Sequence, residues 1–330
     1  MIDARAYARA GLLGNPSDGY YGKTISLIVK NFGAQILLFE SPELVIEPQD
    51  ADSNTFQNIY QLRKTVSQIG YNGGIPIIKA AIKKFLDFCE QSGYRIANRN
   101  FTIRYHTSIP RQVGLAGSSA IVIATMRALM KFYEIDIEPH VLANIALKAE
   151  TEEMGITAGL QDRVIQSFEG CVFMDFEKEN LMASGFGKYV EINTSLLPKL
   201  YIAYKTDLSK VSGRVLNDIK TRYDKGDQLV IETLARIAEI AKEGKEALEK
   251  MEYNKLFNLI NENFDNRCKI MNISSSNMEL VQTARNTGAS AKFTGSGGSI
   301  IGMYEDDEML NKLQISLRKI NARVIKPYFN

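Results

Sequence analysis

The chain has 330 residues, and its 40 Lys and Arg against 38 Asp and Glu give a formal net charge of only +2. That length predicts about two domains with a buried core, and the near-neutral charge excludes a nucleic-acid binder driven by electrostatics. No apolar run approaches the roughly 20 residues that a membrane-spanning helix needs, and the first residues lack the order of a secretory signal. We therefore expect a globular protein with neither a membrane nor a nucleic acid as partner.

The cysteines and histidines exclude two further classes of protein. Cys89, Cys171 and Cys268 are widely spaced and form no Cys-x-x-Cys pair, and the chain has only two histidines. Neither a disulfide framework nor a zinc site is therefore indicated. This cysteine usage is typical of a reducing compartment, so we expect a cytoplasmic protein.

The predicted elements alternate short strands with longer amphipathic helices. A helix begins at Pro76 and ends at Gly93, a second begins at residues 118–119, a third spans 138–153, and 227–271 is strongly helical. The mixture of hairpin-like and crossover connections predicts an α+β or mixed α/β fold. A turn-rich link at 193–199 predicts a domain of residues 1–195 and a second of 196–330. Runs rich in β-branched or aromatic residues predict strands at 35–39, 44–47, 101–106, 171–176, 200–204 and 299–304.

The most informative motif is the segment 109–120, which reads IPRQVGLAGSSA and is followed by an apolar helical run. A strand, a glycine loop and a helix that begins with two serines together form a cradle for an anion, because free N–H groups and the helix dipole point into the loop. The serine hydroxyls there are suited to phosphate or Mg²⁺. Alternatively, Ser118 or Ser119 is simply the N-cap of the helix.

A second feature is an acidic pair around the segment 159–163, which reads GLQDR. Glu150 and Asp162 are separated by one helix end and one loop, and such a pair is suited to holding a metal and orienting a hydroxyl nucleophile. We interpret Glu152 and Glu153 as a solvated helix end. For Arg163, a structural ion pair with Asp162 and a functional role are both open.

Two more glycine-rich segments lie near the ends of the chain. The segment 291–299, AKFTGSGGS, is either a hairpin turn or a backbone that closes over phosphates or a substrate, and its surplus of glycines favours the second. The segment 9–18, RAGLLGNPSD, leads into 17–24, which is one residue short of a P-loop because Ser17 replaces the first glycine. It also follows no convincing hydrophobic strand, so a Walker-type NTPase is not favoured.

These four segments, in this order, resemble the GHMP small-molecule kinases, the family of galactokinase, homoserine kinase and mevalonate kinase. The segment 9–18 is similar to the family's substrate motif, 110–120 to its phosphate loop, and 292–299 to its third motif. One departure is that Ala116 makes the usual Gly-Leu-Gly-Ser-Ser loop one residue longer. That longer loop, with 14–18, 159–163, 170–176 and 292–298, is similar to plant-type glucuronokinases in particular.

The resemblance implies an N-terminal α/β domain and a C-terminal ferredoxin-like α+β domain, with ATP in the cleft between them. It implies transfer of the γ-phosphoryl group of ATP, with Mg²⁺, to the anomeric hydroxyl of D-glucuronate. Asp162 would accept the hydroxyl proton and Arg9 would offset developing charge. Ser119 and Glu150 would hold Mg²⁺, with Ser118 as the alternative hydroxyl. The triphosphate would lie on Gly114, Leu115, Ala116, Gly117, Ser118 and Ser119, and the sugar on Asp18, Tyr21, Arg163, Gly295, Ser296 and Gly297.

Several alternatives stay open at this point. The substrate carboxylate needs a cationic partner, and Arg9, Arg163, Arg111 and Lys23 are all candidates. Another sugar or alcohol, such as galacturonate, galactose or mevalonate, is an alternative acceptor. A ligand sensor that keeps the fold without turnover is an alternative class, although Asp162 and the serine pair are both present. The sequence leaves the oligomeric state, monomer or homodimer, undecided.

Overall fold

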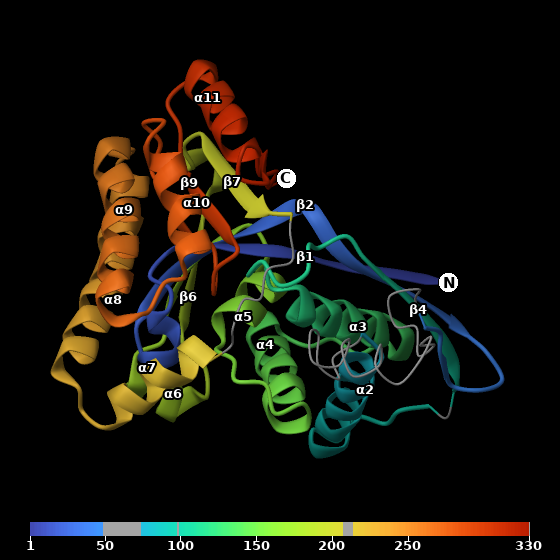
Figure 1. Cartoon of the computed structure of the whole chain (residues 1–330). Coiled ribbons are helices and arrows are strands. Elements are labelled where there is room, and N and C mark those ends of the chain that lie inside the picture. The colour runs from blue at the N-terminus through green and yellow to red at the C-terminus, as the bar shows by residue number, and fades with distance from the viewer. Residues whose placement is uncertain (49–73, 98, 207–213, 330) are drawn as a thin grey trace, which may run out of the picture. The chain divides into compact units, whose positions relative to one another are not determined.

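The computed structural model describes residues 1–48, 74–97, 99–206 and 214–329 (Figure 1). The chain divides into two compact units, each built from separate segments. The first unit comprises Met1–Ala8, Phe32–Ile109 and Ala116–Phe168, and the second comprises Arg9–Asn31, Pro110–Leu115 and Glu169–Asn330. Among the described residues, no helix combines the length and the apolar character needed to cross a lipid bilayer.

The first strand of the chain, β1 (Ile2–Leu13), was not predicted. Its inward positions from Ala4 to Ala10 are alternate alanines, all buried, and the positions between them in its first half are mostly polar or aromatic. Alanine favours helices and is depleted in strands, so a period of two carried by alanine gives a weak strand signal. The segment 17–24 therefore does follow a strand, since β1 ends at Leu13, contrary to our expectation.

The first unit contains a group of helices and strands of a six-stranded sheet that has the order β3-β4-β2-β5-β6, with β1 paired to β2. The second half of β2 (Lys23–Glu40) pairs antiparallel with β4 (Phe101–Thr107), and β3 (Val45–Ile46) pairs parallel with β4. Because α3 is apolar on nearly all sides, it is buried against the other three helices. These helices are α2 (Gly74–Gln91), α3 (Gly117–Tyr133), α4 (Pro139–Lys148), which continues into the π-helical turn Ala149–Glu153, and α5 (Gln161–Phe168).

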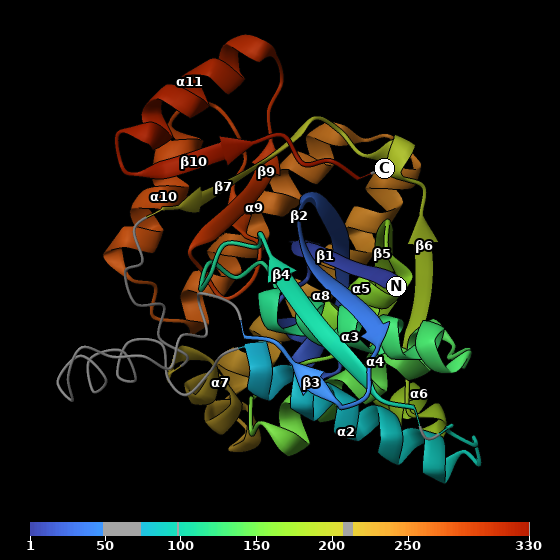
Figure 2. The same ribbon diagram turned by 90° about the vertical axis from the view of Figure 1, so that its right-hand side faces the viewer.

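The second unit contains two groups of strands. The first half of β2 pairs antiparallel with β5 (Cys171–Asp175), which pairs in turn with β6 (Lys188–Ile192). A separate antiparallel sheet has the order β10-β7-β9-β8, and its strands β7, β9 and β10 are seen in Figure 2. Its strands are β7 (Leu200–Lys205), β8 (Lys292–Phe293), β9 (Ser299–Met303) and β10 (Ala322–Ile325).

Helices pack on this four-stranded sheet and form the core of the second unit. Tyr201 and Phe293 of the sheet pack against Phe264 of α9 (Tyr253–Ile270), Leu280 of α10 (Ser275–Arg285) and Leu313 of α11 (Asp307–Arg318). The remaining elements of the unit are α6 (Lys178–Ser184), α7 (Arg214–Asp224), α8 (Gln228–Glu249) and two 3₁₀ turns, Ser17–Tyr20 and Thr194–Leu196.

The predicted mixed α/β class is confirmed, and every predicted strand falls on or overlaps an observed one. The strongly helical stretch predicted at 227–271 is confirmed. It forms two helices, α8 and α9, because Met251 takes a positive φ of 55° between them and interrupts the helical ladder. The predicted boundary at residue 195 falls inside the second unit, close to the 3₁₀ turn before β7, and stays a prediction.

Candidate active site

The predicted phosphate loop passes along the chain from the second unit into the first, where α3 begins. Ala116 is the N-cap of α3, with a left-handed φ of 59° and no hydrogen bond from a capping side chain. Ser118 and Ser119 are both inside the first helical turn, so the alternative that one of them is the N-cap is wrong. The loop keeps the arrangement that binds anions, in which glycine-rich backbone leads directly into a helix N-terminus.

The two serines of the first turn of α3 have different partners. The Ser118 hydroxyl donates a hydrogen bond to Oε1 of Glu150 over 2.7 Å. The Ser119 hydroxyl is fully buried and donates to the carbonyl oxygen of Ala116 over 3.2 Å. Of the two hydroxyls considered for Mg²⁺, the structure therefore places that of Ser118 beside Glu150.

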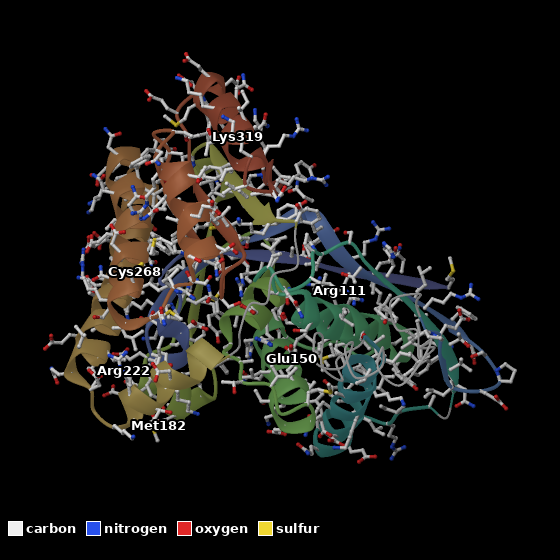
Figure 3. The ribbon with its side chains drawn as sticks, in the orientation of Figure 1. Arg111, Glu150, Met182, Arg222, Cys268 and Lys319 are labelled. Carbon is white, nitrogen blue, oxygen red and sulfur yellow. The ribbon has the colours of Figure 1, made fainter. Side chains whose placement is uncertain are left out.

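Glu150 lies fully buried at the end of α4, among the green helices of Figure 3. Arg163 of α5 donates to its Oε2 from Nε over 2.6 Å and from Nη2, and donates from Nη1 to the carbonyl of Gly159. The same Nη1 lies 3.7 Å from Asp162. Arg163 thus forms a structural ion pair, which was one of our two interpretations. Its main partner is Glu150, whereas that interpretation had expected Asp162. A buried carboxylate needs such a partner because desolvation otherwise makes its charge costly.

A magnesium ion is implied by the predicted chemistry, and the residues present fit it. The described residues contain no cluster of three or more His, Cys, Asp or Glu side chains suited to a metal. Mg²⁺ in phosphoryl-transfer enzymes is commonly held by one or two carboxylates together with substrate phosphates and water. Oε1 of Glu150 and the Ser118 hydroxyl supply one carboxylate oxygen and one hydroxyl oxygen at the N-terminus of α3, which matches that donor set.

Asp162 lies in the first turn of α5, and its side chain is 21% exposed. An acidic side chain in the first turn of a helix interacts favourably with the positive end of the helix dipole. Glu152 and Glu153 instead form ion pairs with Lys84 and Lys83 of α2 at the surface. They take no part in this group, in agreement with the interpretation as a solvated helix end.

In the second unit, backbone hydrogen bonds join three of the four predicted motifs. The N–H of Arg9 donates to the carbonyl of Leu115 over 3.1 Å, and the N–H of Gly11 donates to that of Thr294 over 2.8 Å. The Ser299 hydroxyl donates to the carbonyl of Val113 over 2.5 Å. Segments from the start, the middle and the end of the sequence thus form one compact arrangement.

The glycines of the third motif are required by this close approach. A Cβ at Gly295 would overlap the carbonyl oxygen of Gly114 and lie 2.9 Å from Nη1 of Arg9. A Cβ at Gly114 would in turn lie 2.9 Å from the carbonyl oxygen of Gly297 and 3.1 Å from the backbone nitrogen of Ser296. The segment connects the paired strands β8 and β9, so it is a hairpin loop, as the simpler alternative had it. Its surplus of glycines reflects the packing of backbone against backbone.

The predicted catalytic residue Arg9 is buried, with a relative exposure of 6%. Its Nη1 donates to the carbonyl oxygens of Thr294, over 2.6 Å, and Gly114, over 3.2 Å. Asp18 and Tyr21, predicted to bind substrate, lie in and just after the 3₁₀ turn Ser17–Tyr20, and the Tyr21 side chain is exposed.

The other candidate partners of a substrate carboxylate are placed differently. Lys23 forms an ion pair of 2.6 Å with Asp175, so its charge is already matched. Arg111 is exposed at the start of the loop (Figure 3). Among the described residues, neither side chain forms a hydrogen bond or ion pair with the four motifs.

Two buried cations in this arrangement were missed by the sequence analysis. Lys292 donates to the carbonyls of Gly11 and Phe293, both over 2.8 Å, and to Oδ1 of Asn15 over 2.5 Å. Arg267 of α9 donates from Nη1 to the carbonyl of Gly295 over 2.8 Å. Lys292 lies within the predicted third motif, so its position in the sequence could have singled it out. Arg267 is one of many cations in a helical run, and nothing in the sequence distinguishes it.

Two amides that support the motifs were also missed. Oδ1 of Asn263, on α9, accepts from the N–H of Gly14 over 2.7 Å. In the first unit, Nε2 of Gln166 donates to the carbonyls of Ala116, over 2.9 Å, and Tyr7, over 3.0 Å. Both amides hold backbone where the chain departs from regular structure.

Comparisons with known proteins bear on this arrangement. The family model described as the N-terminal domain of GHMP kinases matches residues 76–170. Glucuronokinase 1 of Arabidopsis thaliana is 41% identical over 306 residues, which cover 91% of this chain and 84% of that protein. The chain belongs to the GHMP kinase family. Probable glucuronokinase 2 of the same plant is 42% identical to this GHMP kinase, again over 91% of this chain and 84% of that protein.

The same fold is found in solved structures of GHMP kinases. The mevalonate kinase of Methanococcus jannaschii superposes with a TM-score of 0.73 over 99% of this chain and 98% of that one, at 20% sequence identity. At that identity the likeness establishes the fold of this GHMP kinase alone.

Proposed function

We propose that this GHMP kinase transfers the γ-phosphoryl group of ATP to the anomeric hydroxyl of D-glucuronate, giving glucuronate 1-phosphate and ADP. The observation that carries the proposal is the 41–42% identity to two Arabidopsis glucuronokinases over 91% of the chain. The motif arrangement supports it, because phosphoryl transfer asks mainly for positioning and for charges that offset those of the phosphates.

In the first unit, we assign Asp162 to accept or orient the proton of the attacking hydroxyl. An anomeric hydroxyl is more acidic than an ordinary alcohol, so a carboxylate is a sufficient base. The backbone of Gly114–Ser119, a loop that runs along the chain from the second unit into the first, would contact the triphosphate. Ser118 and Glu150 would hold Mg²⁺, with Ser119 as the alternative hydroxyl, and the ion when bound would offset phosphate charge.

In the second unit, we assign Arg9 to offset the negative charge that develops during transfer. Its guanidinium is fixed by the carbonyls of Thr294 and Gly114, so it needs little reorganisation when charge develops. Asp18 and Tyr21 are assigned to sugar hydroxyls. The cytoplasmic location expected from the sequence stays a prediction.

The test is the release of ADP with Mg·ATP and one acceptor at a time: glucuronate, galacturonate, glucose, galactose, mevalonate or none. We expect release with glucuronate, accompanied by one equivalent of the sugar 1-phosphate detected by ³¹P NMR. Asp162→Asn in the same assay controls for a contaminating kinase, because it should abolish the signal.

Release with a different acceptor and none with glucuronate would refute the proposed substrate and keep the kinase. No release with any acceptor, from a protein that binds ATP, would favour the ligand sensor.

A further inference from the structure

Two cations lie buried in the second unit without a carboxylate partner. Arg267 and Lys292 are 2% and 1% exposed, and among the described residues neither forms an ion pair within 4.0 Å. Other strongly buried or shielded cations in the chain are matched, such as Arg163 by Glu150 and Lys205 by Glu279. Since an unpaired charge is costly to bury, these two exceptions call for an anion that the described part of the chain does not supply.

Arg267 faces the third motif and has donor capacity to spare. Its Nη1 donates to the carbonyl of Gly295, and its Nε contacts the sulfur of Met271, a weak acceptor. Its Nη2 makes no hydrogen bond within the described part of the chain. Burial lowers the pKa of Arg267 to about 10, which still leaves it charged at neutral pH. Arg267 therefore presents a fixed positive charge with an unused donor.

Lys292 adds a second positive charge to the same arrangement. Its Nζ is surrounded by three acceptor oxygens, and only the ammonium form has three hydrogens to donate to them. Burial and the charges of Arg267 and Arg9 all lower the pKa of Lys292, and no acidic group acts to raise it. All the donors of Lys292 are engaged, so it contributes charge and rigidity, whereas Arg267 has the donor that remains for a ligand.

The positive charge of this cluster exceeds the negative charge nearby. Arg9, Arg267 and Lys292 act on one another electrostatically, and among the described residues Asp18 is the one carboxylate that acts on Arg267. A planar guanidinium matches the two oxygens of a carboxylate better than an ammonium does. Of the other cations considered for this purpose, Lys23 and Arg163 are paired with carboxylates and Arg111 lies at the surface. The Arg9 guanidinium is buried and donates to the carbonyls of Thr294 and Gly114.

We infer that Arg267 is the residue that recognises the carboxylate of the sugar acid, with Lys292 supporting it by charge. The inference rests on the proposed function, because it assigns a specificity-determining residue to the same reaction. It also accounts for Gly295, whose carbonyl aligns the guanidinium. A phosphate of ATP is another anion that a guanidinium could bind. The experiment below distinguishes it from the carboxylate of the sugar acid.

The test compares D-glucuronate with D-glucuronamide, which has the same ring and a neutral amide in place of the carboxylate. In Arg267→Gln, we expect kcat/KM for glucuronate to fall at least ~10-fold while that for the amide changes less than ~3-fold, because a charge-assisted hydrogen bond is lost only with the acid. Calorimetric binding of glucuronate without nucleotide should weaken in parallel. The matched control is Lys269→Gln, which removes the same charge from the same helix and should leave both acceptors unchanged.

Three results would overturn the inference. Equal losses for acid and amide would show that Arg267 is structural. A raised KM for ATP with either acceptor would show that it binds a phosphate. Unchanged selectivity would show that another cation reads the carboxylate.

If Arg267→Gln does not fold, Arg267→Lys decides the matter. Lysine keeps the positive charge but lacks the planar guanidinium. Arg267→Lys should therefore raise KM for glucuronate several-fold and leave KM for glucuronamide unchanged. An equal change in the two KM values contradicts the inference. A wild-type protein that turns over other acceptors but never glucuronate contradicts the proposed function, whatever Arg267 does.

Discussion

Arg163 donates two hydrogen bonds to a single carboxylate oxygen of Glu150, and neither side chain is more than 4% exposed. Replacing Glu150 by Gln leaves the guanidinium charge buried without its partner. We expect Glu150→Gln to lower the free energy of unfolding by about 3–5 kcal/mol, as measured by urea denaturation. It should also raise the Mg²⁺ concentration needed for half-maximal activity.

The control for this prediction is the double variant Glu150→Gln/Arg163→Gln. Because the second substitution removes the unpaired charge, the double variant should lose less free energy of unfolding than the two single variants summed. Additive losses would mean that the two side chains are not coupled. An unchanged metal titration in Glu150→Gln would remove Glu150 from the magnesium site.

Asp162→Asn should lower the single-turnover rate of phosphoryl transfer by about 10²–10⁴-fold, because an amide cannot accept the hydroxyl proton. Binding of ATP and glucuronate should stay within threefold of wild type. Glu152→Gln is the control, since that acid pairs with Lys84 at the surface. A wild-type rate in Asp162→Asn, with both substrates bound, would exclude Asp162 from catalysis.

Gly295→Ala should destabilise the second unit, because its Cβ would overlap the Gly114 carbonyl and press on the Arg9 guanidinium. We expect the midpoint of thermal unfolding to fall by several degrees and kcat to fall with it. At Gly19 a Cβ meets open space, so Gly19→Ala should leave the midpoint within about a degree. Equal midpoints for the two variants would contradict the close approach.

Gln166→Leu tests whether the hydrogen bond from Gln166 to the Ala116 carbonyl holds the phosphate loop in place. The Ala116 carbonyl would keep its hydrogen bonds from Ser119 and from the N–H of Ala120, but lose the one from Gln166. We expect KM for ATP to rise several-fold with kcat little changed. Thr125→Val, which removes another buried hydrogen bond within α3, should leave that KM unaltered. A fall in kcat alone would assign Gln166 a different role.

Cys171 should make stability depend on alkaline pH. Burial raises the pKa of its thiol from 9.0 to about 12, so the thiol stays protonated in the folded chain while the unfolded chain ionises. The folded state then holds more protons than the unfolded state, and stability falls as pH rises from 9 towards 12.

Chemical denaturation of wild type and Cys171→Ala at pH 8 and pH 10 measures this effect. The free energy of unfolding of wild type should fall between these values by about 1 kcal/mol more than that of the variant. The same drop in both proteins would contradict a buried neutral thiol at Cys171.

The sequence allowed the fold class, most strands and the order of the motifs to be predicted, because periodicity and clustered glycine are local signals. It did not predict β1, whose inward face is alanine, or the break at Met251, where a positive φ separates two helices. Strand β1 depends on the burial of its alanine face, a tertiary effect that outweighs local propensity. Met251 is 60% exposed, and the break there is a local helix-ending turn in which the N–H of Glu252 donates to the carbonyl of Ala247.

Within the candidate site, residue types were predicted better than pairings. Glu150 and Arg163 were both singled out, but not as partners of each other, since a loop separates them in sequence. Arg267 was missed because what distinguishes it from other cations is that it is buried without a carboxylate partner in the described structure. That can be seen only when its neighbours in space are known.

The three acceptors of the Lys292 ammonium also bear on how this chain can be divided. Two of them, Gly11 and Asn15, come from the opposite end of the sequence. A C-terminal fragment that begins at residue 196 would therefore hold a lysine whose ammonium has lost most of its solvating oxygens. We expect such a fragment to be insoluble when expressed alone and to be recovered by co-expression with residues 1–195.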